Sequence, residues 1–140
     1  MKPEELQLGD IVTTTPSGMP IKVVAIHRKK VAYHACTDRF SWVRIGLLQP
    51  IPLTREILKK NGFTGGEYKS CTGDVWYLKE EGFRKIGLTM SIKESTLWGE
   101  KIKPHSPDSI GYNFAVPNIK FVHELQHALK LCGIYKEIII

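Results

Sequence analysis

The feature that most constrains the fold is a series of short apolar runs, separated by turn residues, in the first third of the chain. β-branched side chains dominate residues 20–27, and apolar and aromatic side chains follow in 31–35 and 40–45. Gly, Pro, Asp and Ser supply turns at 9–10 and 16–18, and a basic triplet forms the expected hairpin tip. About five short strands within roughly 50 residues predict an SH3-like β-barrel.

The expected barrel covers residues 1–53, and a second region covers 54–140. Two prolines in 49–53 hold the chain extended at the boundary between them. Thr54 is placed to cap a short helix over 55–61, which the following glycine would end.

The second region is predicted to hold a small sheet and a helix. Strands are expected at 76–78, 83–92, 96–98 and 112–116. Gly65-Gly66 favours a turn and 103–109 a loop. A final helix is expected between Asn118, which would cap its start, and Gly133, which would follow its last residue. The isoleucine-rich tail, 134–140, should be tucked in or paired as a strand. The sequence therefore predicts an α+β protein in which an SH3-like β-barrel is followed by a small antiparallel sheet packed against a C-terminal helix.

Composition narrows the class of protein. Hydrophobic residues make up 42% of the 140 residues, enough for a core. The sequence has no run of about 18 apolar residues, so it predicts no membrane-spanning helix. The charged N-terminus lacks the apolar segment of a signal peptide. The three scattered cysteines, Cys36, Cys71 and Cys132, are expected to be buried free thiols. These features predict a cytoplasmic protein with no membrane partner.

The net charge of +6, from 20 basic and 14 acidic side chains, favours a polyanionic partner. The residues expected to contact nucleic-acid phosphates are Lys22, Arg28, Lys29 and Lys30. Trp42 and Tyr33 would offer stacking surfaces. Aromatic residues at alternating strand positions also commonly face a core, so both interpretations stay open.

The segment His-Glu-Leu-Gln-His at 123–127 is the one short motif with a specific chemistry. Two histidines four apart on a helix can hold zinc, and the intervening Glu can act as general base. A zinc-dependent, metallopeptidase-like hydrolase would use His123 and His127 as ligands and Glu124 as base.

Helical geometry argues against this use. The apolar residues of the helix lie within roughly 60° of Leu125. They are Phe121, Val122, Leu125, Ala128, Leu129 and Cys132. Both histidines lie about 160° away, which predicts exposed rings beside Lys120 and Lys130. A third zinc ligand would have to come from upstream, for example from His34 or His105.

Three segments resemble a family of small proteins from Bacteroides-type bacteria and their phages or integrated elements. The Pro-Ile-Pro-Leu-Thr of 50–54, with Glu-Ile-Leu at 56–58 and Asn-Gly-Phe at 61–63, is similar to a central segment of that family. Phe-Val-His-Glu-Leu-Gln at 121–126 resembles its C-terminal helix, and 8–12 its first strand. The family has no assigned activity.

This resemblance implies a role without catalysis. Some members have Asn where this chain has His127, which implies that a two-histidine zinc site is not needed. Together with the charge, the resemblance predicts a non-enzymatic accessory or interaction protein of a phage or mobile element, whose partner is nucleic acid or a protein bound to it. This hypothesis assigns no catalytic residue, metal or cofactor, and the alternative is the zinc hydrolase. The oligomeric state is left open.

Overall fold

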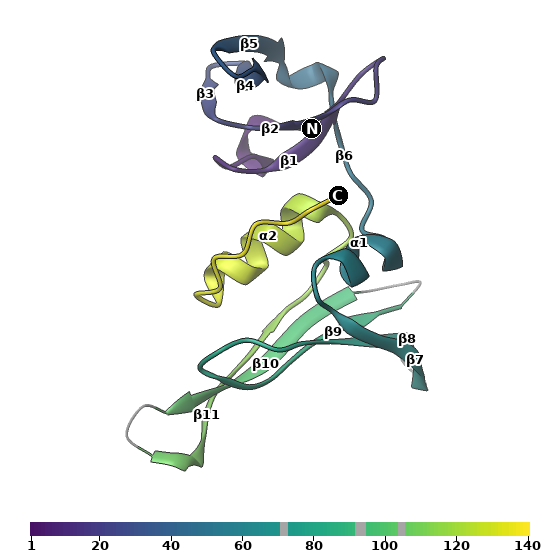
Figure 1. The fold of residues 1–140 in the computed structure, drawn as a ribbon, viewed down its shortest axis with the longest axis vertical. Coiled ribbons are helices and arrows are strands. Elements are labelled where there is room, and N and C mark those ends of the chain that lie inside the picture. Colours follow the sequence, from purple (N-terminus) through teal and green to yellow (C-terminus); the bar gives the residue numbers. More distant parts are fainter. Residues whose placement is uncertain (71–72, 92–94, 104–105) are drawn as a thin grey trace. The chain divides into compact units, whose positions relative to one another are not determined.

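The protein is α+β, and the residues that the structure describes form mostly antiparallel strands in three sheets, together with two α-helices (Figure 1). The computed structural model describes residues 1–70, 73–91, 95–103 and 106–140. The chain divides into a first unit of 1–52 with 121–126, and a second unit of 53–120 with 127–140. In the described ranges, no helix combines the length and the apolar character needed to cross a membrane.

The first unit is built from short strands and two 3-10 helices. In chain order these are η1 (Pro3–Glu5), β1 (Ile11–Thr14), β2 (Pro20–Lys22), β3 (Ala25–His27), β4 (Lys30–Cys36), β5 (Arg39–Arg44), η2 (Ile45–Leu47) and β6 (Leu48–Pro50). They form two three-stranded antiparallel sheets, β2–β1–β6 and β3–β4–β5. No closed barrel forms among the described strands.

The strand predicted over 20–27 is present as two strands, because the chain bends at Val23 and Val24. The Val23 N–H donates to the Asp10 carbonyl (2.9 Å), continuing the pairing of β2 with β1. The Val24 N–H donates to the Ala32 carbonyl (2.9 Å), which begins the pairing of β3 with β4. One bent segment therefore takes part in both sheets.

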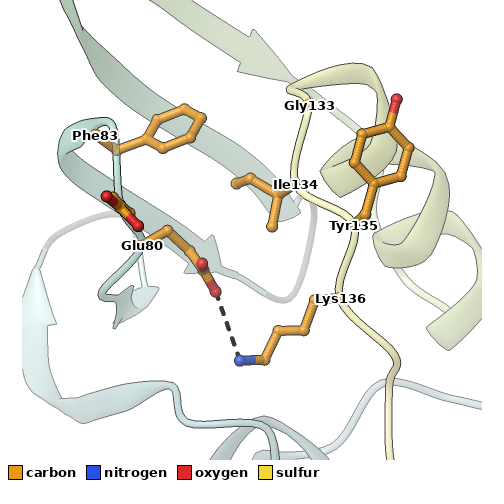
Figure 2. A pocket seen from close by; sticks show the side chains of 7 residues that line it. Glu80, Phe83, Gly133, Ile134, Tyr135 and Lys136 are labelled. Carbon is orange, nitrogen blue, oxygen red and sulfur yellow. Dashed lines mark ion pairs between the residues drawn. The ribbon is translucent and has the colours of Figure 1, made fainter.

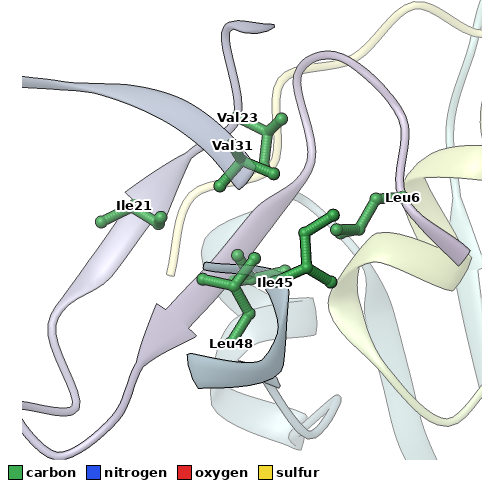
Figure 3. Close-up of a cluster of buried hydrophobic side chains, with 7 residues drawn as sticks. Leu6, Ile21, Val23, Val31, Ile45 and Leu48 are labelled. Carbon is green, nitrogen blue, oxygen red and sulfur yellow. The ribbon is translucent and has the colours of Figure 1, made fainter. Parts of the chain in front are cut away.

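The apolar core of this unit draws on both sheets. Its buried residues are Leu6, Val12, Ile21, Val23, Val31, Ile45 and Leu48 (Figure 3). Val43 and Tyr33 are partly buried against the same cluster. Since side chains alternate along a strand, this core defines the inner face of each sheet.

The second unit contains a five-stranded antiparallel meander and a short helix. Its elements are α1 (Arg55–Lys60), β7 (Thr64–Ser70), β8 (Gly73–Leu78), β9 (Phe83–Met90), β10 (Ser95–Lys103) and β11 (Ser106–Val116), in the sheet order β11–β10–β9–β8–β7. The turn predicted at Gly65-Gly66 is wrong, because both residues lie in β7, where the register with β8 is irregular. The predicted loop is wrong for 106–109, which begin β11, and 104–105 lie outside the described residues.

The first helix and the C-terminal tail are joined by one buried side chain. The Ile57 N–H donates to the Thr54 hydroxyl (3.3 Å), which confirms the predicted cap of α1. Asn61, 4% exposed, follows that helix. Its amide donates to the Ile139 carbonyl (2.7 Å) and accepts from the Ile139 N–H (2.8 Å). The tail is therefore tucked in without forming a strand, and Ile138 is buried.

The C-terminal helix, α2 (Val122–Leu131), begins three residues later than a cap at Asn118 predicts. Asn118 does not cap it, because Asn118 has a φ of 64°, in the left-handed region. The Val122 N–H donates instead to the Ile51 carbonyl (2.9 Å), and Phe121 forms an isolated β-bridge with Pro52. These contacts hold the start of α2 against residues 51–52, within the first unit.

Candidate nucleic-acid interface

The five residues of the His-Glu-Leu-Gln-His segment lie in α2, and most of them hold the helix in place. The Phe121 N–H donates to the Glu124 carboxylate (3.1 Å), one half of a capping box at the helix start. The His123 ring stacks on Phe121, with centroids 5.9 Å apart. Leu125 is fully buried. The carboxylate assigned as general base in the hydrolase hypothesis therefore caps its own helix.

Gln126 connects this helix to the first strand of the same unit. Its amide nitrogen donates to the Gly9 carbonyl (3.0 Å), and its amide oxygen accepts from the Ile11 N–H (3.1 Å). The side chain thus offers a backbone-like donor and acceptor to the main chain at the start of β1. With 6% of its surface exposed, it is a buried polar group whose hydrogen bonds are satisfied.

The prediction that His123 and His127 are exposed is wrong. His123 is 5% exposed and His127 is half-buried. The apolar stripe is buried as predicted, apart from the half-buried Phe121, but the helix is enclosed around more of its circumference than that stripe. Gln126, on the same helix, is buried outside the apolar stripe because both ends of its amide form hydrogen bonds.

The upstream residues considered as a third zinc ligand have other positions. His34 lies in β4, with its ring 4.4 Å from that of Phe40, and His105 lies outside the described residues. Within the part of the chain that the structure describes, no three His, Cys, Asp or Glu side chains form a group able to hold a metal ion.

A different set of side chains gathers on the β3–β4–β5 sheet, on the face opposite the core. Residues paired across an antiparallel sheet share a face, so the pairing assigns each row. The pairs Ala32↔Trp42, His34↔Phe40, Lys30↔Arg44, His27↔Lys30 and Ala25↔Ala32 lie on this side. The pairs Val31↔Val43 and Ile26↔Val31 lie on the core side. We call the first set the outer face.

Two large aromatic rings of the outer face are exposed. Phe40 is 60% exposed and Trp42 is 52% exposed. A histidine contacts each of them: His34 lies beside Phe40, and His27 meets Trp42 edge to face with centroids 6.4 Å apart. Tyr33, the other predicted stacking residue, is half-buried against the core. The sequence left open whether Trp42 and Tyr33 face solvent or the core. Trp42 faces solvent, whereas Tyr33 packs against the core.

The positive charges predicted to bind phosphate cluster at one end of this sheet, with one exception. Arg28 and Lys29 form the exposed turn between β3 and β4, and Lys30 begins β4 next to Arg44. Strands β3, β4 and β5 contain no acidic residue, the nearest in sequence being Asp38 in the turn before β5. Lys22 is the exception: it lies in β2, opposite Ile11, on the other sheet.

Two residues of this face, Phe40 and Arg44, were missed as binding candidates, although the sequence carries a signal for them. Phe40, Trp42 and Arg44 recur at every second position, while Val43 falls between them. A period of two places the three on one face of a strand, and a charged member favours the solvent side.

The second unit has a hollow of about 330 Å³ near the C-terminal tail. Figure 2 shows Phe83 and Ile134 on its walls, and Lys136 paired with Glu80 (3.5 Å). This ion pair joins the tail to the segment between β8 and β9. The hollow therefore lies where the C-terminal tail packs against this segment, and its charged residues help to hold the tail.

The cysteines occupy contrasting environments. Cys36, at the end of β4, is exposed, so the prediction of a buried thiol is wrong there. Cys132 is buried as predicted, and this burial raises the pKa of its thiol, an effect that nearby Lys101 partly offsets. Cys71 lies outside the described residues.

Comparison with known protein families, with curated proteins and with solved structures finds no match for this chain.

Proposed function

We propose that this protein is a non-enzymatic accessory or interaction protein of a phage or mobile element, and that its N-terminal unit is an SH3-like module that binds nucleic acid. The strand order supports such a module: β1 pairs with β2 and β6, and one bent segment continues from β2 into β3. Its two sheets do not close into a barrel among the described strands.

The observation that carries the nucleic-acid role is the outer face, where exposed aromatic rings lie beside basic side chains in strands without acidic residues. Phosphates attract the positive end of this sheet and fix the ligand's position. The rings add sequence-tolerant contact with bases. Arg28, Lys29, Lys30 and Arg44 serve as phosphate contacts, whereas Lys22 on the other sheet contributes to the overall positive field.

Salt-dependent binding tests this role. The slope of log K against log salt should fall by roughly 1.4 to 1.8 in the double variant Lys29→Ser/Lys30→Ser, because each lost phosphate contact removes about 0.7 to 0.9. The matched control is Lys59→Ser/Lys60→Ser, which removes the same charge from exposed positions of α1. Binding that does not respond to salt, or equal loss in both double variants, would refute the proposal.

Arg28 offers a second test with an intact turn. Its φ of 52° lies in the left-handed region, which costs a non-glycine residue roughly 1 to 2 kcal/mol. Arg28→Gly removes the charge and relieves this cost. We expect weaker binding from a protein at least as stable as the parent, measured by oligonucleotide titration and by urea unfolding. Unchanged affinity would remove Arg28 from the interface.

A further inference from the structure

We infer that the nucleic acid taken by the outer face is single-stranded, with unpaired bases lying on the rings of Trp42 and Phe40. This inference rests on the proposed function and adds the substrate class. Its first support is exposure: Trp42 and Phe40 are each more than half exposed as residues, and both belong to β5. A base can lie on such a ring only if its own flat face is uncovered.

The spacing of the two rings decides between single and double strands. Trp42 and Phe40 are two residues apart on one strand, so their side chains leave the backbone about 6.8 Å apart. Consecutive bases in a duplex strand are separated by roughly 3.4 Å. Neighbouring bases that contact both rings must therefore part from each other, which a duplex does only by unstacking its base pairs, at a free-energy cost for every step that opens. A single strand meets this requirement at low cost.

The neighbouring side chains fit the same ligand. His27 lies beside Trp42 and His34 beside Phe40, so each aromatic ring packs against a neighbouring side chain. Packed side chains lose less entropy on binding than free ones. The row that holds His27, Lys30 and Arg44 is adjacent to the row of Trp42. Positive charge therefore lies next to the aromatic pair, where the phosphates of a strand with splayed bases would run.

The test compares single-stranded oligothymidylate of about 12 nucleotides, a length that one small fold can cover, with a duplex of the same length. We expect tighter binding of the single strand. Trp42→Ala and Phe40→Ala should each weaken it by roughly 5- to 150-fold, the range measured for lost base stacking. Trp42→Phe, which keeps an aromatic ring, should retain more affinity than Trp42→Ala. The matched control is Met19→Ala, another exposed apolar side chain of the same unit.

The outcomes separate this inference from the function on which it rests. Single-strand preference with loss in the two aromatic variants, and none in Met19→Ala, supports both. Equal or tighter duplex binding overturns the single-strand inference. Single-strand binding that tolerates Trp42→Ala and Phe40→Ala overturns it as well. In both of these cases, sensitivity to Lys29→Ser/Lys30→Ser leaves the nucleic-acid role in place. Absence of binding to either oligonucleotide overturns both proposals. Circular dichroism of each variant shows that it is folded.

Discussion

Replacing Gln126 by alanine should destabilise the first unit by about 2 to 4 kcal/mol. The structure supplies the reasoning: two hydrogen bonds, to the Gly9 carbonyl and from the Ile11 N–H, end on a side chain that is 6% exposed. Each contributes about 1 kcal/mol net, and more if the backbone group left behind is shielded from water. The lower figure, about 2 kcal/mol, is the sum of the net contributions of the two hydrogen bonds. The upper figure, about 4 kcal/mol, adds the cost of leaving the Gly9 carbonyl and the Ile11 N–H without a partner.

Two readouts check this figure. Urea unfolding followed by circular dichroism gives the change in free energy of unfolding for Gln126→Ala. Native-state hydrogen exchange reports on the site itself, because the Ile11 amide donates to Gln126. A local loss of 2 to 4 kcal/mol would speed exchange of that amide by roughly 30- to 900-fold when exchange follows the opening equilibrium.

Two further variants separate hydrogen bonding from packing. Gln126→Met keeps a long side chain but makes neither bond, so it should lose most of the same stability. Gln49→Ala removes an exposed glutamine of β6 and should stay within about 0.5 kcal/mol of the parent. The reasoning is refuted if Gln126→Met is as stable as the parent, or if Gln126→Ala costs no more than Gln49→Ala.

Three further expectations concern other parts of the chain. Iodoacetamide should modify exposed Cys36 well before buried Cys132, whose raised pKa leaves little thiolate at neutral pH; peptide mapping by mass spectrometry would show the order, and equal rates would contradict it. Gly87→Ala should cost roughly 1 to 3 kcal/mol in urea unfolding, because its new methyl group would overlap the Trp98 indole; an unchanged midpoint would show that the indole moves aside freely. Asn61→Ala should release the C-terminal tail to carboxypeptidase digestion, and a tail as resistant as the parent's would mean that other contacts hold it.

Local signals predicted the elements whose boundaries depend on a few adjacent residues. Thr54 caps α1 as expected, since its hydroxyl needs only the N–H three residues later. The start of α2 was misplaced because Asn118 resembles a cap in sequence, whereas its backbone is left-handed. The half capping box of Phe121 and Glu124 is visible in the sequence only after the start is known.

Burial around α2 was beyond sequence reasoning for a different reason. A helical wheel identifies the most apolar direction, here correctly, but it does not say how much of the circumference is covered. His123 and Gln126 lie outside that stripe and are nevertheless buried. Gln126 can be buried because it forms hydrogen bonds with Gly9 and Ile11, and these partners lie more than 100 residues away in the chain. Such long-range pairing leaves no periodic signal.

The register of β4 and β5 links the core of the first unit to its candidate interface. Val31 is fully buried and is paired with Val43, so these two side chains define the inner face. A shift of one residue would turn Phe40 and Trp42 inward. That alternative register offers more apolar area to the core. Arg44, however, lies on the same face of β5 as Phe40 and Trp42 and would point inward with them. Burying an unpaired guanidinium costs several kcal/mol, comparable with what the two rings would add. Arg44 therefore helps to keep both rings in solvent, and the same residue that fixes the face supplies a charge for the ligand.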